Sequence, residues 1–443
     1  MANELTTELW KLSNTMLDVA TRSKEMLREK KIWFTPKVEN FQYEEGIKGY
    51  SIKERFSERE GLSIKSHEFV ETEIKSLAQY KEIVSTISKT YNTNLQQADY
   101  WLSRFCQSIL SSSISGITEE ELVERVSTFI RDLENIPKEW SPTVWLDGIW
   151  MKTDKITLQE GTEIRRPTPS DIEQAFERPM ELLMWPDIAP QQFPSAILVI
   201  KLRFRHQPEV LEEIERIVNV LRLYKVGSVM NIRTKWNVKS ILELQGTTFR
   251  TSITESTYKY GIGSNDLERL KGFFQTMKPL IPDEIVKTGI ETIDYITIAL
   301  QRYNDSLLKP DTIEARLTSA IMCLEALYLK TAEREELSHR LAQRVAKVLS
   351  RLGNNPMEVY HTLKRAYDIR SKYVHGSQIE KEERQDLRRT MDMALEYARL
   401  SLVLLLQLRS STEKQNFLNL VDNSLLSKEA SDKLQDMLST LTF

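Results

Sequence analysis

The chain is poor in cysteine. Its 443 residues include two, Cys106 and Cys323, which are far apart in sequence and each lie within an apolar helical pattern. Two distant cysteines provide neither a disulfide framework nor the ligand spacing of a zinc site. We therefore expect two small buried side chains in a protein of the reducing cytoplasm.

Signals for export, membrane insertion and common cofactors are also missing. The N-terminal segment carries mixed charges early and has no apolar core, unlike a secretory signal. The apolar stretch 400–408 is interrupted by Ser401 and Gln407 and is far shorter than the roughly 20 residues of a membrane span. Glycine-rich phosphate loops do not occur, and four of the five histidines lack paired metal-ligand spacing. We expect no membrane partner, no metal and no cofactor.

The chain also lacks an excess of positive charge. It carries 61 basic and 64 acidic side chains, for a formal net charge of -3. A nucleic-acid-binding protein usually shows a basic field, so any affinity of this chain for RNA must be local.

Length and composition indicate a multidomain globular protein. Hydrophobic residues make up 40% and charged residues 28% of the chain, and 443 residues are too many for one ordinary domain. We predict an α+β, predominantly helical fold in three parts. These are a mainly helical region at 1–139, a mixed α/β domain at 140–262, and a helical bundle with a C-terminal helical extension at 263–443.

Local patterns define these three parts. In the first, helical patterns surround an interruption at 33–50 that contains Pro36 and two glycines, and Thr118 opens a T-x-x-E capping box. In the second, a helix at 208–223 lies among short segments rich in β-branched and aromatic residues. The predicted strands are 145–153, 155–158, 196–205, 224–236 and 238–244. The predicted helices of the third part are 265–277, 284–306, 311–331, 335–352, 356–373, 379–409 and 427–441.

One short motif in the helical part carries chemistry. Arg370, four intervening residues and His375 lie at a helix end, since Gly376 is a natural helix stop. On an ideal helix the two side chains point about 140° apart. They can act together if the helix unwinds at 374–376 or if a second copy completes the site. Taken alone, the pair is better explained as capping the helix carbonyls and binding water.

The surroundings of the motif resemble a known family. The segments 321–328, 336–346 and 367–376, followed by a long amphipathic helix, look like the Apea-like branch of the HEPN superfamily over about residues 290–410. In that superfamily a small helical bundle presents an Arg-x(4–6)-His motif, and two subunits usually form one ribonuclease site. The chain differs from many members at Ser371, where they have Asn, Asp or His.

The resemblance implies a function. It implies a metal-independent endoribonuclease, a homodimer through the C-terminal helical domain, and a role in defence against phage by abortive infection. The N-terminal region and the mixed α/β domain would then respond to an unknown activating ligand or phage component.

The residue types suit RNA cleavage. RNA supplies its own nucleophile, the 2′-hydroxyl, so cleavage needs a base, an acid and positive charge on the phosphorane. Histidine, with an ordinary pKa of about 6.5, can serve as base or acid, and a guanidinium binds two phosphate oxygens in a fork. We assign catalysis to Arg370 and His375, the second histidine coming from the partner subunit.

Supporting residues are assigned around this pair. Ser371 and Tyr373 flank the motif, and Glu325 can orient Arg370 or His375 or pair with an unrelated arginine. Both interpretations of Glu325 remain open. Residues 331–390 hold 13 basic and 9 acidic side chains, and this excess forms either a phosphate track or a solvated helix face with internal ion pairs. The candidate RNA-binding residues are Arg340, Arg344, Lys347 and Lys372.

Two other classes of function compete with the enzyme. The first is a HEPN-fold module that binds RNA or a nucleotide without turnover, which Ser371 keeps open. The second is an assembly or sensor protein in which the bundle serves only for dimerisation. The presence of both Arg370 and His375 argues against this second class.

Overall fold

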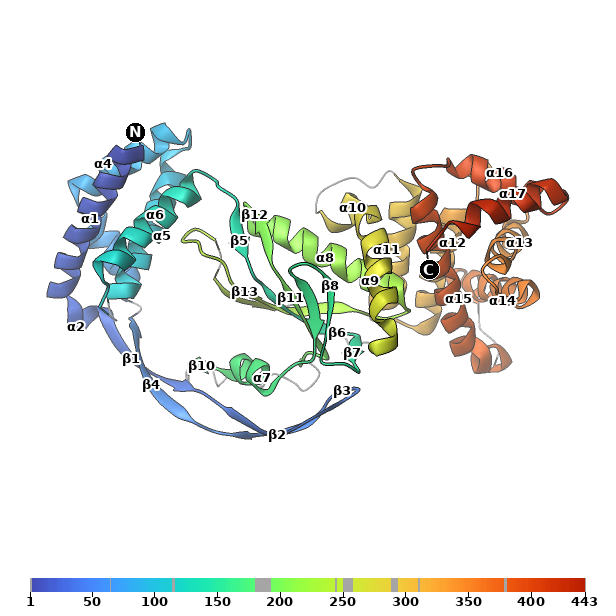
Figure 1. The fold of residues 1–443 in the computed structure, drawn as a ribbon, viewed down its shortest axis with the longest axis horizontal. Helices are drawn as coiled ribbons and strands as arrows, with labels where there is room; N and C mark the ends of the chain where they lie inside the picture. The colour runs from blue at the N-terminus through green and yellow to red at the C-terminus, as the bar shows by residue number, and fades with distance from the viewer. Residues whose placement is uncertain are drawn as a thin grey trace.

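A computed structural model describes residues 2–63, 65–113, 116–179, 193–243, 245–249, 258–287, 294–309, 311–377 and 381–442. The fold is α+β and predominantly helical, as predicted. Along the longest axis of the molecule, an N-terminal helical region, a central sheet and a C-terminal set of helices follow one another (Figure 1). Within the described ranges, no helix combines the length and the apolar character that a membrane crossing requires.

The N-terminal helices enclose a core of their own. Leu9, Leu12 and Met16 on the first helix are fully buried against the helices that follow. The capping box at Thr118 is confirmed, since the Glu121 amide donates to the Thr118 hydroxyl at 3.2 Å and the Thr118 amide donates to the Glu121 carboxylate at 3.0 Å. The helices are α1 (Ala2–Arg22), α2 (Lys24–Leu27), α3 (Lys65–Phe69), η1 (Val70–Ile74), α4 (Ala78–Thr90), α5 (Leu95–Ser113) and α6 (Glu119–Leu133).

A long antiparallel ribbon connects these helices to the central sheet (Figure 1). Its strands are β1 (Arg28–Phe34), β2 (Lys37–Glu44), β3 (Gly46–Lys53) and β4 (Phe56–Leu62). β1 pairs with β4 and β2 pairs with β3, and Gly46 has the positive φ of 99° at the tight turn between β2 and β3. The predicted interruption of the helices at 33–50 is confirmed, since the described residues between Leu27 and Lys65 form no helix, but the strands that fill it were not predicted.

The tip of this ribbon is fixed to the central sheet. The Tyr43 hydroxyl donates to the Ser195 carbonyl at 2.7 Å and accepts from the Met151 amide at 2.7 Å. The Arg166 guanidinium lies 5.4 Å from the centre of the Tyr43 ring. The ribbon thus spans the distance between two separate cores.

The central sheet has six strands in the order β14-β13-β6-β11-β9-β8, and each neighbouring pair is antiparallel. Side chains alternate between its faces, so that Val144 and Leu198 pack with α8 whereas Trp145 and Ile197 pack on the side of α7. The elements are β6 (Thr143–Asp147), β8 (Lys155–Gln159), β9 (Thr162–Arg165), α7 (Pro169–Phe176), β11 (Ala196–Ile200), α8 (Gln207–Tyr224), β13 (Met230–Trp236) and β14 (Gly246–Phe249).

Short strand pairs extend this central region. They are β5 (Lys138–Trp140) with β12 (Leu202–Phe204), β7 (Ile149–Met151) with β15 (Tyr260–Ile262), and β10 (Arg178–Pro179) with β1. The predicted strand at 238–244 does not form in the described part, where Val238 makes an isolated bridge to Trp140.

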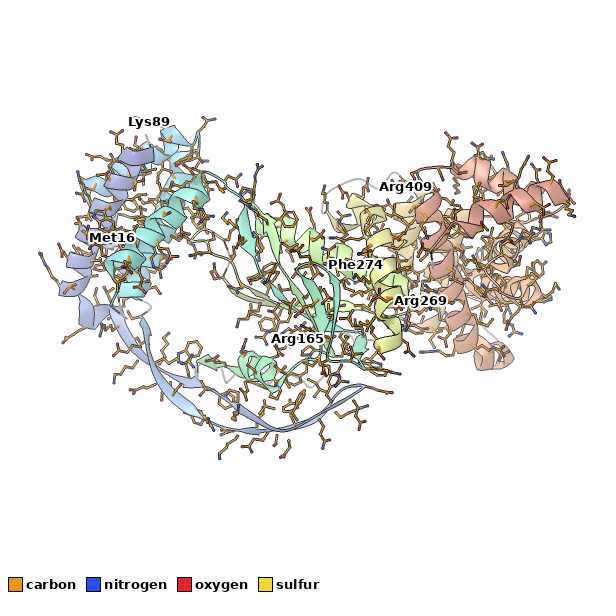
Figure 2. All side chains as sticks on the ribbon, viewed as in Figure 1. Met16, Lys89, Arg165, Arg269, Phe274 and Arg409 are labelled. Atoms are coloured by element: carbon orange, nitrogen blue, oxygen red, sulfur yellow. The ribbon has the colours of Figure 1, made fainter. Side chains whose placement is uncertain are left out.

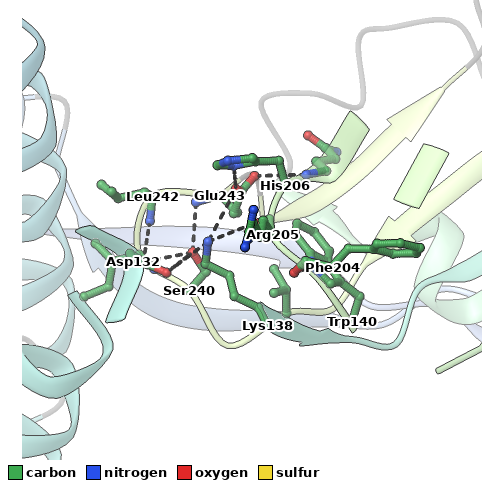
Figure 3. A network of polar contacts seen from close by, with 12 residues as sticks. Asp132, Lys138, Trp140, Phe204, Arg205, His206, Ser240, Leu242 and Glu243 are labelled. Carbon is green, nitrogen blue, oxygen red and sulfur yellow. Dashed lines mark hydrogen bonds and ion pairs between the residues drawn. The ribbon is translucent and has the colours of Figure 1, made fainter. Parts of the chain in front are cut away.

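A buried carboxylate joins the N-terminal helices to the segment after β13 (Figure 3). Asp132 accepts hydrogen bonds from the Ser240 hydroxyl and from the amides of Ile241 and Leu242, at 2.9, 2.7 and 3.1 Å. Lys138 lies 3.4 Å from the same carboxylate. Since Asp132 is 7% exposed, these partners replace the water that an ionised carboxylate needs.

The C-terminal helices form a bundle around α12, which contacts α11, α14 and α15. Leu317, Ile321 and Leu324 of α12 are fully buried. The predicted helix at 284–306 is described as two, and its residues 288–293 lie outside the described ranges. The helices are α9 (Leu267–Met277), α10 (Asp283–Val286), α11 (Tyr295–Leu308), α12 (Ile313–Tyr328), α13 (Leu337–Ser350), α14 (Pro356–Val374), α15 (Lys381–Leu408), α16 (Lys414–Asn423) and α17 (Lys428–Ser439).

The bundle and the central sheet share one continuous hydrophobic core, which extends from Trp140 to Leu438. Polar contacts reinforce it at the C-terminus of α8, where Arg399 donates to the carbonyls of Leu223 and Tyr224 at 2.8 and 3.2 Å. These carbonyls have no partner within the helix, so α15 caps α8. The residues predicted as two domains, 140–262 and 263–443, thus pack on each other without a break in the core.

Candidate active site

Helix α14 positions the predicted motif. Asn355 caps its N-terminus by accepting from the amides of Met357 and Glu358, and Pro356 occupies the first helical position. A buried stripe holds the helix against the bundle and places Arg370 beside a buried position. The stripe consists of Val359, Leu363, Ala366 and Ile369.

The C-terminus of α14 confirms the predicted helix stop. The Ser377 amide donates to the Lys372 carbonyl at 2.8 Å and the Gly376 amide donates to the Tyr373 carbonyl at 3.2 Å. This pair of bonds is a Schellman motif, which requires the left-handed conformation that Gly376 adopts with φ of 69°. His375 is therefore the last residue before the chain turns away, with φ of -89° and ψ of 6°.

The side chain of Arg370 contacts residues of the bundle and is only partly exposed to solvent. Its Nη2 donates to the Glu325 carboxylate at 3.3 Å, and its guanidinium lies 5.3 Å from the centre of the Tyr367 ring. The side chains of Arg370 and Glu325 are 25% and 19% exposed. Of the two interpretations of Glu325, the structure supports the one in which it orients Arg370. The role of Tyr367 was missed, although its position three residues before Arg370 places both on one helix face.

Not all N–H donors of the Arg370 guanidinium have a hydrogen-bond acceptor among the described residues. Its Nε is buried and has no hydrogen-bond partner in the described part of the chain, and its one ion pair is long. Burial raises the pKa of the Glu325 carboxyl, although the charge of Arg370 and a hydrogen bond with Tyr367 oppose the rise. The Glu325 carboxylate is partly desolvated and its contact with Arg370 is long, so it binds the guanidinium weakly. An anion with better geometry can therefore replace Glu325 at Arg370.

His375 is exposed at the helix end. Its imidazole makes no hydrogen bond or ion pair with any residue that the structure describes, whereas Arg370 is directed to Glu325 and Tyr367. Within one chain the two side chains are not brought into contact. Next to His375, Tyr373 and Val374 are 41% and 55% exposed, and Ser371 is half-buried with its carbonyl accepting from the His375 amide.

The candidate RNA-binding residues lie in different surroundings. Arg344 is 2% exposed and uses all five of its N–H donors within the protein. They bind the Glu333 carboxylate at 2.6 and 2.8 Å, the Asp422 carboxylate at 2.7 and 2.8 Å, and the Tyr328 carbonyl at 2.8 Å. No donor is left for a phosphate, so the structure gives Arg344 a structural role instead of the predicted RNA contact.

The remaining basic residues differ from Arg344 in exposure. The Lys347 ammonium donates to the Ser431 hydroxyl of α17 at 3.2 Å, so it too faces another helix. Arg340 has a side chain that is 43% exposed and lies 3.5 Å from Glu333, and Lys372 is half-buried near the end of α14. The predicted basic face is thus divided, with its middle covered by α16 and α17.

In the described part of the chain, the bundle carries a guanidinium with an unused donor and an exposed imidazole near the C-terminal end of one helix. Among the described residues, no three His, Cys, Asp or Glu side chains gather as a metal site requires. Comparison with protein-family models, with curated proteins and with solved structures found no match to this chain. The fold and the geometry of the motif are therefore the observations on which a function can be argued.

Proposed function

We propose that the C-terminal bundle is a metal-independent endoribonuclease of the HEPN type, with Arg370 and His375 as its catalytic residues. The observation that carries the proposal is the contrast between two arginines of this bundle. Arg344 is saturated and buried, whereas Arg370 has an orphaned Nε, one long ion pair and a side chain that is 25% exposed. An arginine held in place but not saturated is suited to receive a phosphate.

The proposed chemistry follows from the types of these groups. The Arg370 guanidinium binds the scissile phosphate and stabilises the charge of the phosphorane, while Glu325 and Tyr367 keep it in place. One His375 removes the proton from the 2′-hydroxyl, which attacks the adjacent phosphorus. The His375 of the second copy protonates the 5′-oxygen that leaves, so the products are a 2′,3′-cyclic phosphate and a 5′-hydroxyl.

A homodimer completes this site. One chain supplies a single histidine at the motif, and acid–base catalysis needs two proton-transfer groups. The exposed Tyr373 and Val374 lie beside His375 and provide apolar surface that a two-fold related copy can cover. The resemblance to Apea-like HEPN proteins adds a cytoplasmic role in antiphage defence, with the N-terminal region and the central sheet responding to an activating ligand or phage component.

Cleavage of single-stranded RNA in EDTA tests the proposal. We expect purified protein to leave 2′,3′-cyclic or 3′-phosphate ends, and His375→Ala to reduce the rate by about 10² to 10⁴. His361→Ala is the matched control, because His361 is exposed on the same helix and lies outside the motif. Arg370→Ala should reduce both cleavage and RNA affinity, whereas His375→Ala should change affinity by less than about tenfold.

The same experiment separates the enzyme from the binding module. RNA binding that depends on Arg370 without any cleavage would favour the binding module. A strict requirement for Mg²⁺, or 5′-phosphate products, would exclude the mechanism. Light scattering that gives the mass of one chain during cleavage would exclude the dimeric site.

A further inference from the structure

A polar cavity of about 230 Å³ lies on the face of the central sheet that α7 partly covers. Arg165, labelled in Figure 2, lies in this central part of the molecule. The cavity is smaller than the roughly 300 Å³ at which drug-sized ligand sites begin, so it suits a small molecule and not a nucleic-acid strand. Among its lining residues are Trp145, Arg165, Gln174, Arg233, Lys235 and Asn237.

Strand register places Arg233 in this cavity. The register of β13 shifts at a bulge between Asn231 and Arg233. Beyond the bulge, Arg233 pairs with Trp145 of β6 and with Phe249 of β14. Directly opposite residues lie on the same face of a sheet, so the guanidinium is flanked by two rings, at 4.3 Å from the Trp145 centre and 4.6 Å from the Phe249 centre.

The charge of Arg233 has no counter-charge among the described residues. The residue is 9% exposed, makes no ion pair or hydrogen bond there, and has a buried Nη1 without a partner. Burial alone lowers the pKa of its guanidinium to about 10. The two rings stabilise the cation from the sides, but they leave the N–H donors at its edge unused.

Other buried arginines of this chain have hydrogen-bond or ion-pair partners, unlike Arg233. Arg222 donates to the Val229 carbonyl at 2.8 Å, Arg316 to the Ser306 carbonyl at 2.8 Å, and Arg399 to carbonyls of α8 and to Glu396. Each of them caps backbone or pairs with a carboxylate. A buried cation without such partners destabilises the fold, and a ligand that supplies the missing negative charge removes that cost.

The charges around the cavity define the ligand. Arg165 is neutralised by Asp171 through two hydrogen bonds of 2.7 and 2.8 Å. The Lys235 ammonium donates to the Gln174 side-chain oxygen at 2.8 Å, which is a neutral partner. Two positive charges, on Arg233 and Lys235, therefore remain without a carboxylate partner in the described chain.

We propose that this cavity binds a compact phosphate monoester, whose phosphoryl oxygens accept hydrogen bonds from Arg233 and Lys235. A dianion matches the two free charges, and the fork of a guanidinium matches two phosphoryl oxygens. The volume leaves room for a small organic group that contacts Asn237 and the other polar side chains. The site is separate from the α14 motif and does not depend on the proposed nuclease activity.

Binding and melting experiments on the full chain test this site. Ribose 5-phosphate and inorganic phosphate are the probes, and ribose is the uncharged control. We expect ribose 5-phosphate to raise Tm by about 4 °C at a concentration of 100 Kd, and Arg233→Met to weaken its binding at least tenfold. Lys155→Met, which removes one positive charge from the far edge of the same sheet, should bind like the parent.

The melting temperature of ligand-free variants shows whether Arg233 serves a ligand or the stability of the fold. Without ligand, Arg233→Met should melt at or above the Tm of the parent, because an unpaired buried charge is replaced by an apolar chain of similar length. Arg233→Lys, which keeps the charge but loses the fork, should fold and bind weakly. Equal affinity for inorganic phosphate and ribose 5-phosphate would confirm a phosphate site but refute the monoester, because the organic group would then contribute nothing to binding. A large drop in the Tm of ligand-free Arg233→Met, or binding of the probes that is indifferent to Arg233, would overturn the proposal.

Discussion

Replacing Arg344 with Met tests whether this residue is structural or binds RNA. Arg344 donates five hydrogen bonds from a side chain that is 2% exposed, and the substitution removes four of them from Glu333 and Asp422. The two carboxylates keep only weaker contacts, such as those with Lys330. Removing one member of a buried ion pair typically costs about 3 to 5 kcal/mol, because the remaining charges lose their compensation. We expect a loss of stability of this size.

The expected shift in melting temperature follows from the size of the cooperative unit. The core shared by the sheet and the bundle extends from Trp140 to Leu438, or roughly 300 residues. At about 2.1 cal/mol/K per residue, its unfolding entropy is about 0.6 kcal/mol/K, so 3 to 5 kcal/mol corresponds to about 5 to 8 °C in Tm. Thermal unfolding followed by circular dichroism measures this shift directly.

Arg340→Met is the matched control. Arg340 is one helical turn away on α13, has a side chain that is 43% exposed, and makes only a long contact of 3.5 Å with Glu333. Its replacement should change stability by less than about 1 kcal/mol. A folded Arg344→Met protein with the melting temperature of the parent and a selective loss of RNA affinity would refute the structural assignment.

Three further predictions concern the pH dependence of the Arg344 contacts and two other positions, Gly376 and Asp132. The hydrogen bonds from Arg344 hold the pKa of Glu333 at about 2, below its ordinary value of 4.5, so their stabilisation is complete above pH 4.5 and is lost as the pH falls towards 2. Urea unfolding should therefore show the cost of Arg344→Met shrinking by about 1 to 2 kcal/mol between pH 6 and pH 3. Gly376→Ala meets no atom within 4 Å but forces a left-handed Ala, so we expect a loss of about 1 kcal/mol in denaturant unfolding. Asp132→Ala leaves the Ser240 hydroxyl and the amides after it without an acceptor; chemical denaturation should show a loss of about 3 kcal/mol, and an unchanged midpoint would contradict the assigned network.

The helices of the C-terminal part could be predicted from sequence, because the residues that start and end them are local in the chain. The predicted helix 356–373 is observed as Pro356–Val374, since Asn355, Pro356 and Gly376 mark its ends. The strands of the ribbon at 28–62 were not predicted, because the alternation of apolar and polar residues, as at Phe41 and Tyr43 or at Tyr50 and Ile52, is short and the pairing of β2 with β3 is irregular. Its strands are specified by pairing with each other and by contacts such as Tyr43 with Ser195, which are far apart in sequence.

The candidate sites, too, could be predicted only where they depend on local sequence. The end of α14 that carries His375 followed from sequence, but the partner of Arg370 required the packing of α12 on α14. Helical spacing put Arg340, Arg344 and Lys347 near one another, and only the fold places Asp422 of α16 over the middle of that set. The cavity at Arg233 had no signal in the sequence, because the bulge in β13 decides which face that side chain occupies.

The two candidate sites lie in one continuous structure. β13, which carries Arg233, begins just after a segment that is fixed to the bundle, where the Ser228 hydroxyl donates to the Leu307 carbonyl of α11 at 3.0 Å. The Arg222 side chain ties α8 to the same segment by donating to the Val229 carbonyl at 2.8 Å. Arg399 of α15 caps the end of α8, and α15 packs along α14, which carries the proposed catalytic motif. Close-packed cores transmit displacements instead of absorbing them, so a ligand bound to Arg233 would act on elements that are connected to the α14 helix. If both proposals hold, this connection is the route by which a small anion would regulate the proposed ribonuclease.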